Sequence, residues 1–230
     1  MISLDMIKLK ALRAMLRYYH KSFDKKKIKV DEITLTIERG IFSPKYTFSS
    51  AALLSFLKSK TIRRTFRVVD VGTGSGIIAI FLSSTKKLRW VIASDISIHA
   101  AKVSLRNIKD NNLYSYTDVV VCDCLSPFRD SAVDLVISNP PYLPLNPRNG
   151  LDMLFCAGEK LEVLIKLVRQ SRRCLKRRGT LIFTISSLTP FDSVSKALVD
   201  NGFVYIRHQM SRTPFDKIYV MDAILISKED

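Results

Sequence analysis

A repeated alternation of short apolar segments with helical segments is the feature that most constrains the fold of this chain. The pattern predicts strands at residues 67–71, 90–94, 118–122, 133–138, 180–186, 204–210 and 219–227, and helices at 47–57, 76–84, 97–111, 159–176 and 192–201. Apolar strands separated by helices form a parallel sheet that is covered on both faces. The short connection between the last two strands predicts an antiparallel pair. We therefore expect an α/β fold with a mostly parallel seven-stranded sheet and an antiparallel last strand.

The first 40 residues do not follow this alternation. Residues 3–23 have helical spacing, with lysines and arginines opposite an apolar stripe of Leu4, Ile7, Leu9, Leu12, Met15, Leu16 and Tyr19. Residues 28–37 alternate as a strand or hairpin does. We therefore divide the 230 residues into an extension, 1–40, and a main domain, 41–230, with the helix packed on that domain. A helix lying on a membrane surface would have a similar pattern.

The chain is strongly basic, with a formal net charge of +16. This charge favours a polyanionic partner, RNA first, or else a generally basic surface. Charge alone does not say whether RNA is the substrate or the platform for a protein substrate. No apolar run reaches the ~20 residues that span a bilayer, and the N-terminus lacks the features of a secretory signal. We expect a cytoplasmic protein with no membrane contact.

The cysteines give no indication of a metal site. Cys122, Cys124, Cys156 and Cys174 form no CxxC pair, and the chain has three histidines. We expect buried thiols, because free cysteine behaves as a small apolar residue. A disulfide is the alternative if the chain comes from a hyperthermophile.

A glycine-rich segment follows the first core strand. It reads Asp70-Val71-Gly72-Thr73-Gly74-Ser75-Gly76. Glycines let the backbone turn sharply and approach a ligand closely, and the following helix adds free N–H groups. The spacing differs from that of the dinucleotide-binding fingerprint. Taken alone, the segment could equally be a structural turn.

Two acids follow the next two strands. Asp95 ends the second core strand and can accept both ribose hydroxyls of a nucleoside. Asp123 ends the third and can accept a hydrogen bond from an adenine amino group. Parallel sheets bind ligands at the carboxyl ends of their strands. We therefore expect a nucleoside-binding site there, with Ile96 and Cys124, the residues after these acids, also in contact with the ligand.

The most specific motif follows the fourth core strand, at Asn139-Pro140-Pro141-Tyr142. The two prolines stiffen the turn. The side-chain carbonyl of Asn139 and the backbone carbonyl of Pro140 can then converge as two acceptors. They match a planar NH2 group, which has two donors, and Tyr142 could stack on the flat group that carries it. The alternative is a proline-stiffened turn with Asn139 as a local cap.

This strand-by-strand arrangement resembles the Rossmann-like class I methyltransferases over residues 41–227. The resemblance implies S-adenosylmethionine as cofactor and S-adenosylhomocysteine as product, with the sulfonium near Asp70. It implies catalytic roles for Asn139, Pro140, Pro141 and Tyr142. The cofactor-binding residues that it implies are Thr47, Asp70, Gly72, Thr73, Gly74, Gly76, Asp95, Ile96, Asp123, Cys124 and Asn139.

Within that class, the chain resembles the HemK-type N5-glutamine methyltransferases. The resemblance rests on Leu143-Pro144 after the motif, on residues 41–48 with Thr47 beside the cofactor, and on the Ala157-Gly158 stretch. These enzymes methylate the glutamine of the Gly-Gly-Gln motif in translation release factors. The short N-terminal region is similar to the archaeal and eukaryotic branch, whose members can pair with a small zinc-binding activator protein that covers an apolar sheet edge.

The sequence also departs from the HemK pattern. Acidic residues are usual where Lys45 and Tyr46 stand, and Glu159 replaces a second glycine. Together with the basic charge, these departures keep a second substrate open: an exocyclic amino nitrogen of adenine or guanine in RNA. A nonenzymatic binding module is a third hypothesis, and the intact acids and Asn139 make it the least favoured.

Overall fold

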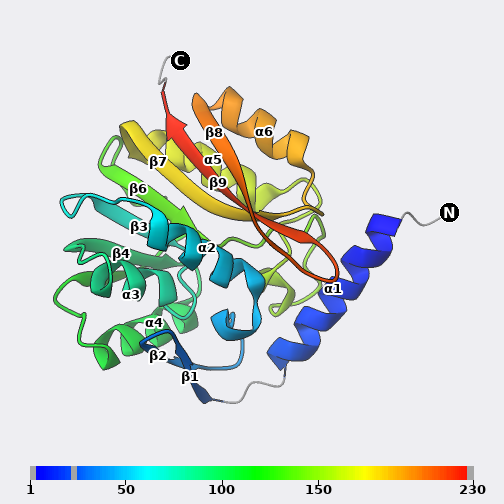
Figure 1. Ribbon diagram of the computed structural model, residues 1–230, viewed down its shortest axis with the longest axis horizontal. Helices are drawn as coiled ribbons and strands as arrows, with labels where there is room; N and C mark the ends of the chain where they lie inside the picture. Colours follow the sequence, from blue (N-terminus) through cyan, green and yellow to red (C-terminus); the bar gives the residue numbers. More distant parts are fainter. Residues whose placement is uncertain (1–3, 22–24, 227–230) are drawn as a thin grey trace.

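A seven-stranded sheet runs through the middle of the molecule in the computed structural model, which describes residues 4–21 and 25–226 (Figure 1). In spatial order its strands are β5 (Thr117–Val121), β4 (Trp90–Asp95), β3 (Arg67–Val71), β6 (Val133–Ser138), β7 (Leu175–Ser186), β9 (Lys217–Leu225) and β8 (Phe203–Arg212). β9 is antiparallel to β7 and β8, whereas the other neighbouring strands pair in parallel. The predicted sheet, with its antiparallel last strand, is confirmed.

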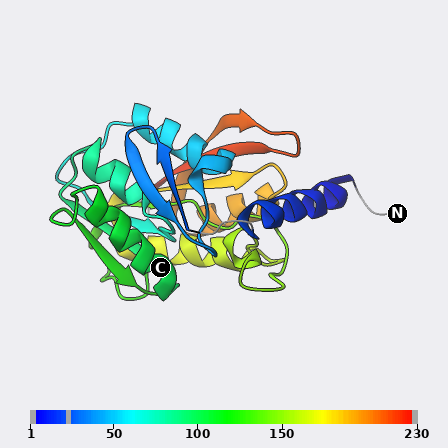
Figure 2. The ribbon, with the colours of Figure 1, turned by 90° about the horizontal axis from the view of Figure 1, so that it is seen from below.

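Helices cover both faces of this sheet, as Figures 1 and 2 show. The helices are α2 (Phe48–Ser59), α3 (Ile77–Ser84), α4 (Ile98–Asp110), α5 (Glu162–Cys174) and α6 (Phe191–Asp200). Successive residues of the central strands enter two separate cores. Val69 and Val136 pack with α5 and α6, whereas Val68 and Leu135 pack with α2, α3 and α4. Burial on both faces is the reason that these strands are almost continuously apolar.

Two predicted helix starts can be compared with the structure. Ser97 caps α4, whose start was predicted there, since its Oγ accepts a hydrogen bond from the Ala100 N–H at 3.2 Å. Thr47 occupies the N-cap position of α2, but its hydroxyl donates to the Ser43 carbonyl instead of accepting from the helix. The buried Thr47 side chain therefore stabilises the turn before α2 through its hydrogen bond to Ser43.

The predicted helix at residues 159–176 is wrong at both ends. It begins at Glu162, because Gly158 and Leu161 have φ values of 89° and 58°, which no α-helix contains. It ends at Cys174, because Leu175 is fully buried and pairs with Val133 as the first residue of β7. The strand predicted at 180–186 is wrong at its start for the same reason, since β7 begins at Leu175. The remaining predicted elements of the main domain agree with the structure to within two residues at each end. Residue 227 of the last predicted strand lies outside the described residues.

The N-terminal helix α1 (Leu4–Lys21) packs against the domain through part of its apolar stripe. Leu9, Leu12 and Leu16 are buried in the same core as α5 and α6. Ile7 and Tyr19 of the predicted stripe are instead 53% and 45% exposed. The buried face is thus narrower than predicted, and residues 3, 22 and 23 of the predicted helix lie outside the described residues.

An antiparallel hairpin follows α1. It consists of β1 (Lys26–Val30) and β2 (Ile33–Ile37), as the alternating pattern predicts. Leu35 and Ile37 of β2 are fully buried in the core beneath α2, α3 and α4. The hairpin therefore contributes to the main core, and the division of the chain at residue 40 stays a prediction.

The cysteines are free thiols. Cys156 and Cys174 are buried, whereas Cys122 and Cys124 are partly exposed. Within residues 4–21 and 25–226, no cluster of histidine, cysteine and acidic residues could hold a metal ion. No helix in the same ranges is both long and apolar enough to cross a bilayer.

Candidate active site

The glycine-rich segment forms the turn between β3 and α3. Gly72, Gly74 and Gly76 have φ values of 69°, 55° and 85°, which favour glycine at each position. Gly76 is also sterically restricted, because a Cβ there would lie 2.8 Å from Oγ of Ser104 on α4. The turn therefore brings bare backbone to the carboxyl end of β3.

Asp70 lies fully buried at the base of this turn. Its Oδ2 accepts hydrogen bonds from the Thr73 hydroxyl at 2.6 Å and from the Ala79 N–H at 3.2 Å. Its Oδ1 has no partner within the described part of the chain. Burial raises the pKa of Asp70 to about 7, although both hydrogen bonds oppose this shift. A buried carboxylate with an unpaired oxygen is suited to a nearby cationic ligand group.

Asp95 connects the end of β4 to the glycine turn. Its Oδ2 accepts from the Gly74 N–H and its Oδ1 from the Ser97 N–H, both at 2.9 Å. Each oxygen keeps a second acceptor position for a ribose hydroxyl. Burial raises the pKa of Asp95, while the backbone donors act in the opposite direction. The next side chain, Ile96, is 60% exposed and offers an apolar surface beside the carboxylate.

Asp123 lies beyond the end of the neighbouring strand β5. The Cys122 N–H donates to the Asp95 carbonyl at 3.0 Å, so these two strand ends are held side by side. Oδ2 of Asp123 pairs with Nζ of Lys166 on α5 at 2.7 Å, and both side chains are about half exposed. Burial raises the pKa of the adjacent Cys124 thiol to about 12, so it stays protonated at neutral pH.

Asn139 projects from the end of β6, beside β3, with its side chain held from two directions. Its Oδ1 accepts from the hydroxyl of Thr184 on β7 at 2.6 Å, and its Nδ2 donates to Oγ of Ser50 on α2 at 3.0 Å. Thr184 and Ser50 are both buried. The two bonds fix the amide plane, and Oδ1 retains one lone pair for a further donor.

The same contacts connect Asn139 to the segment before α2. The Thr47 hydroxyl lies 3.4 Å from Oγ of Ser50, which in turn accepts from Asn139. Thr47 and Asn139 are therefore close, as the sequence predicts for residues around one cofactor. Lys45 of this segment is exposed, and the side chain of Tyr46 lies outside the described part of the chain.

Tyr142 is placed differently from Asn139. Its side chain is 7% exposed and belongs to the core beneath α5 and α6. Its backbone carbonyl accepts from the Thr189 hydroxyl at 2.9 Å. Burial raises the pKa of Tyr142, helped by the charge of Asp216 and opposed by a hydrogen bond with Ser49. In this structure the Tyr142 side chain packs in the core under the Asn139–Tyr142 turn. Its stacking on a substrate stays a prediction.

The segment after Tyr142 folds back on itself and is anchored to α1. Leu143 bridges to Cys156, and between them lies Asp152, which is fully buried. Asp152 forms an ion pair with Arg13 of α1 and accepts from the Arg148 N–H at 3.0 Å. Burial alone would raise the pKa of Asp152, but these hydrogen bonds and the charges of Arg13 and Arg17 hold it below the usual range.

Sequence reasoning missed three residues of this site: Ser50, Thr184 and Lys166. A signal for Thr184 was present, because it lies near the carboxyl end of the strand beside β6. Ser50 and Lys166 lie on helices, and nothing in a single sequence distinguishes them from other helical residues.

The residues of the site fit S-adenosylmethionine. The glycine turn exposes backbone to a ligand, and the unpaired Oδ1 of Asp70 suits a cation. Asp95 and Asp123 have acceptor positions for a ribose and an adenine amino group, respectively. These strand ends lie at one edge of the sheet, which is where parallel α/β sheets bind ligands.

Comparison with known proteins agrees with this geometry. The family model described as the methyltransferase small domain matches residues 32–210. A release factor glutamine methyltransferase of Mycolicibacterium smegmatis is 28% identical over 192 residues, which are 79% of this chain and 68% of that protein. A putative protein N5-glutamine methyltransferase of Methanocaldococcus jannaschii is 25% identical over 202 residues, which are 85% of this chain and 98% of that protein.

Other similarities concern the domain and its fold. A bifunctional methyltransferase of Rickettsia typhi is 26% identical over 75% of this chain, which spans 35% of that longer protein. The chain thus covers about a third of this relative and two thirds of the mycobacterial one. The fold also resembles that of a solved structure, geranyl diphosphate C-methyltransferase from Streptomyces coelicolor in complex with S-adenosyl-L-homocysteine. The two superpose with a TM-score of 0.64 at 12% identity, and the match covers 93% of this chain and 98% of that one.

The family match covers residues 32–210, which are most of the chain, and the α/β fold agrees with that match. The protein therefore belongs to the methyltransferase small domain family.

Proposed function

We propose that this enzyme methylates a planar NH2 nitrogen, the side-chain amide of the glutamine in the Gly-Gly-Gln motif of a translation release factor. The observation that carries the proposal is Asn139, held by Ser50 and Thr184 at a proline-stiffened strand end. Two relatives named as glutamine methyltransferases, at 28% and 25% identity, support the same acceptor. Because release factors act in the cytoplasm, we expect the enzyme there.

The mechanism follows from how an amide nitrogen must be held. S-adenosylmethionine supplies a methyl group on a sulfonium, and the Asp70 carboxylate favours that positive charge. Oδ1 of Asn139 and the carbonyl of Pro140 accept the two amide N–H bonds and direct the nitrogen at the methyl carbon. Methylation would leave a positive charge on the amide nitrogen, which would lose one proton to solvent while Asn139 and Pro140 hold the amide in place, and S-adenosylhomocysteine would be the second product. No strong general base is needed.

The cofactor contacts in this proposal are those predicted from the sequence. The cofactor would contact the backbone of Gly72, Thr73, Gly74 and Gly76. Its ribose would contact Asp95 and Ile96, and its adenine would contact Asp123 and Cys124. Thr47 lies next to Ser50, with 3.4 Å between their hydroxyl oxygens. Asp95→Ala should raise the dissociation constant of the cofactor, whereas Asn139→Ala should cut turnover severely and leave that constant nearly unchanged.

Methyl transfer to a purified release factor tests the proposal. The full chain is incubated with tritiated cofactor and release factor, and the labelled peptide is identified by mass spectrometry. We expect label on the glutamine of the Gly-Gly-Gln motif and none when that glutamine is replaced. Absence of label with an activator protein present would refute the proposal. In cell extract, label that is removed by nuclease and resists protease would instead assign the enzyme to an RNA base, which the names of the relatives do not favour.

We also propose that a small zinc-binding activator covers the β5 edge of the sheet. β5 is an edge strand, and Val121 at its end is 50% exposed. Three large side chains near this edge are exposed as well: Trp90, Tyr114 and Tyr116. An apolar strand edge is a typical surface for pairing with another chain. Coexpression with the activator should raise the yield of soluble, unaggregated enzyme, and Val121→Lys should remove that effect.

A further inference from the structure

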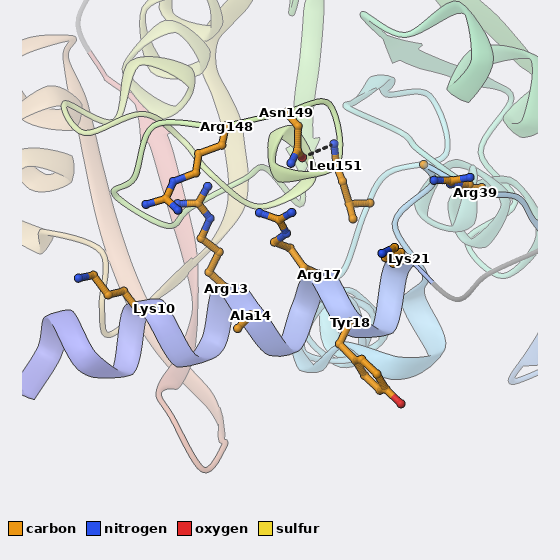
Figure 3. A pocket seen from close by; sticks show the side chains of 11 residues that line it. Lys10, Arg13, Ala14, Arg17, Tyr18, Lys21, Arg39, Arg148, Asn149 and Leu151 are labelled. Atoms are coloured by element: carbon orange, nitrogen blue, oxygen red, sulfur yellow. Dashed lines mark hydrogen bonds between the residues drawn. The ribbon is translucent and has the colours of Figure 1, made fainter.

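A basic groove lies between α1 and the segment that follows the catalytic turn (Figure 3). Its volume is about 980 Å³. Six cationic side chains line it: Lys10, Arg13, Arg17, Lys21, Arg39 and Arg148. We propose that this groove, hereafter the α1 groove, binds the phosphate backbone of single-stranded RNA. RNA rather than DNA rests on the proposed function, because RNA is the polyanion that surrounds a release factor on the ribosome.

The charges of the α1 groove are largely uncompensated. Asp152 forms ion pairs with Arg13 and Arg17. Within the described residues, no ion pair joins a carboxylate to any of the other four cations. Figure 3 shows Arg13, Arg17 and Arg148 converging from the two walls of the groove. Arg13 is 8% exposed and pairs with Asp152, so the four cations without such a pair among the described residues, Lys10, Lys21, Arg39 and Arg148, are the ones that favour a bound polyanion.

The cations also form a row along α1. Lys10, Arg13, Arg17 and Lys21 are spaced by three or four residues and therefore lie along one side of the helix. From Lys10 to Lys21 the helix rises about 16 Å, at 1.5 Å per residue. A stacked strand rises about 3.4 Å per nucleotide, so the row could contact roughly five nucleotides.

The chemistry of the groove favours nucleic acid over an acidic peptide or a membrane. Four of the six cations are arginines, whose planar fork matches phosphate oxygens. Tyr18 also lines the groove, is 74% exposed and offers a ring for a base to stack on, at the outer side of α1 in Figure 3. The apolar side of α1 is unavailable to lipid, because Leu9, Leu12 and Leu16 are buried in the core.

The position of the groove would place RNA beside the methyl acceptor. Arg148 lies six residues after Tyr142, and Arg39 lies four residues before Ser43, whose carbonyl accepts from Thr47. The wall that carries Arg148 therefore continues from the catalytic turn, and Arg39 lies close in sequence to the segment that carries Thr47. RNA in the groove would act as a platform next to the acceptor, without itself being methylated.

Fluorescence anisotropy with a labelled oligouridylate of about 12 nucleotides, a typical single-strand site size, tests this inference without any methyl transfer. The test variant is Lys10→Gln/Arg39→Gln/Arg148→Gln, whose three positions are exposed. The matched control, Lys102→Gln/Arg177→Gln/Arg178→Gln, removes the same charge from exposed positions outside the groove. Thermal melting establishes that both variants fold as the unmodified chain does.

We expect the groove variant to bind RNA at least about tenfold more weakly and its salt dependence to fall by about 2 in the log–log slope, at about 0.7 per phosphate contact. The control should change affinity less than about threefold, because it acts through screened long-range charge alone. Equal losses in both variants, or no loss in either, would overturn the proposal. Tighter binding of labelled polyglutamate, duplex DNA or anionic vesicles than of RNA, lost in the groove variant, would also overturn it.

Discussion

Loosening the Asn139 side chain through its buried partners should slow methyl transfer without weakening cofactor binding. Thr184→Val removes the donor to Oδ1, and Ser50→Ala removes the acceptor of the Nδ2 hydrogens. A buried hydrogen bond contributes about 1 kcal/mol net, and about 1.4 kcal/mol corresponds to a tenfold change in rate. Each single change should therefore lower kcat about fivefold.

The double change should have a larger effect, because the Asn139 amide would then have no fixed plane. A loss of about 2–3 kcal/mol corresponds to roughly a 30- to 150-fold lower kcat. The dissociation constant of S-adenosylmethionine should change less than about twofold, well below the tenfold that 1.4 kcal/mol represents. Ser83→Ala is a matched control, because Ser83 is also a buried hydroxyl with a 2.7 Å partner, Thr117, on another part of the sheet.

The assay combines steady-state transfer of tritiated methyl to the release factor with calorimetric titration of the cofactor. If Ser50 acts through Asn139, then Ser50→Ala should cause no further loss of kcat in an Asn139→Ala background. Additive losses in that background would show that Ser50 acts elsewhere. A rise in the cofactor dissociation constant that matches the fall in kcat would refute the positioning role altogether.

Three further predictions concern the cofactor end of the sheet. Because burial raises the pKa of Asp70 to about 7, the carboxylate is protonated below neutral pH. Calorimetry should then show weaker binding of S-adenosylmethionine as pH falls from 8 to 6, by at most about tenfold per pH unit. S-adenosylhomocysteine, whose sulfur carries no charge, should show little change, and in Asp70→Asn the ratio of the two affinities should not vary with pH. Lys166→Met frees Asp123 from a half-exposed ion pair and should tighten cofactor binding by up to about fivefold, as expected for a pair worth up to about 1 kcal/mol; weaker binding would show that Lys166 itself contacts the cofactor. Gly76→Ala should lower the melting temperature by roughly 3–10 °C, since a strained φ costs about 1–3 kcal/mol, and Ser104→Gly in the same chain should recover only the steric part.

The parallel sheet could be predicted from the sequence because its strands carry an unambiguous signal. Val68 and Val69 enter opposite cores, so both positions must be apolar, and the pattern is visible without knowledge of the partners. The limits of α5 could not be predicted in the same way. Leu175 is compatible with a helix by propensity, and only its burial against Val133 makes it the first residue of β7.

The site residues likewise fall into those that a local sequence pattern locates and those that only tertiary contacts bring to the site. Asp95, Asp123 and Asn139 follow directly after strands, so the ends of the predicted strands locate them. Ser50 and Lys166 reach the site from helices, across tertiary contacts that no local pattern encodes. The charge of +16 indicated a polyanionic partner, but it did not locate the α1 groove, because the cations of that groove come from three separate parts of the sequence.

The burial of Asp152 has a consequence for where the enzyme can be shortened. The family match begins at residue 32, after α1, and a minimal catalytic fragment might be designed to start there. Such a fragment would lack Arg13 and Arg17, the ion-pair partners of Asp152. It would also uncover the apolar core that Leu9, Leu12 and Leu16 share with the segment between Leu143 and Cys156. The first helix is therefore part of the smallest unit that can keep the catalytic turn in place.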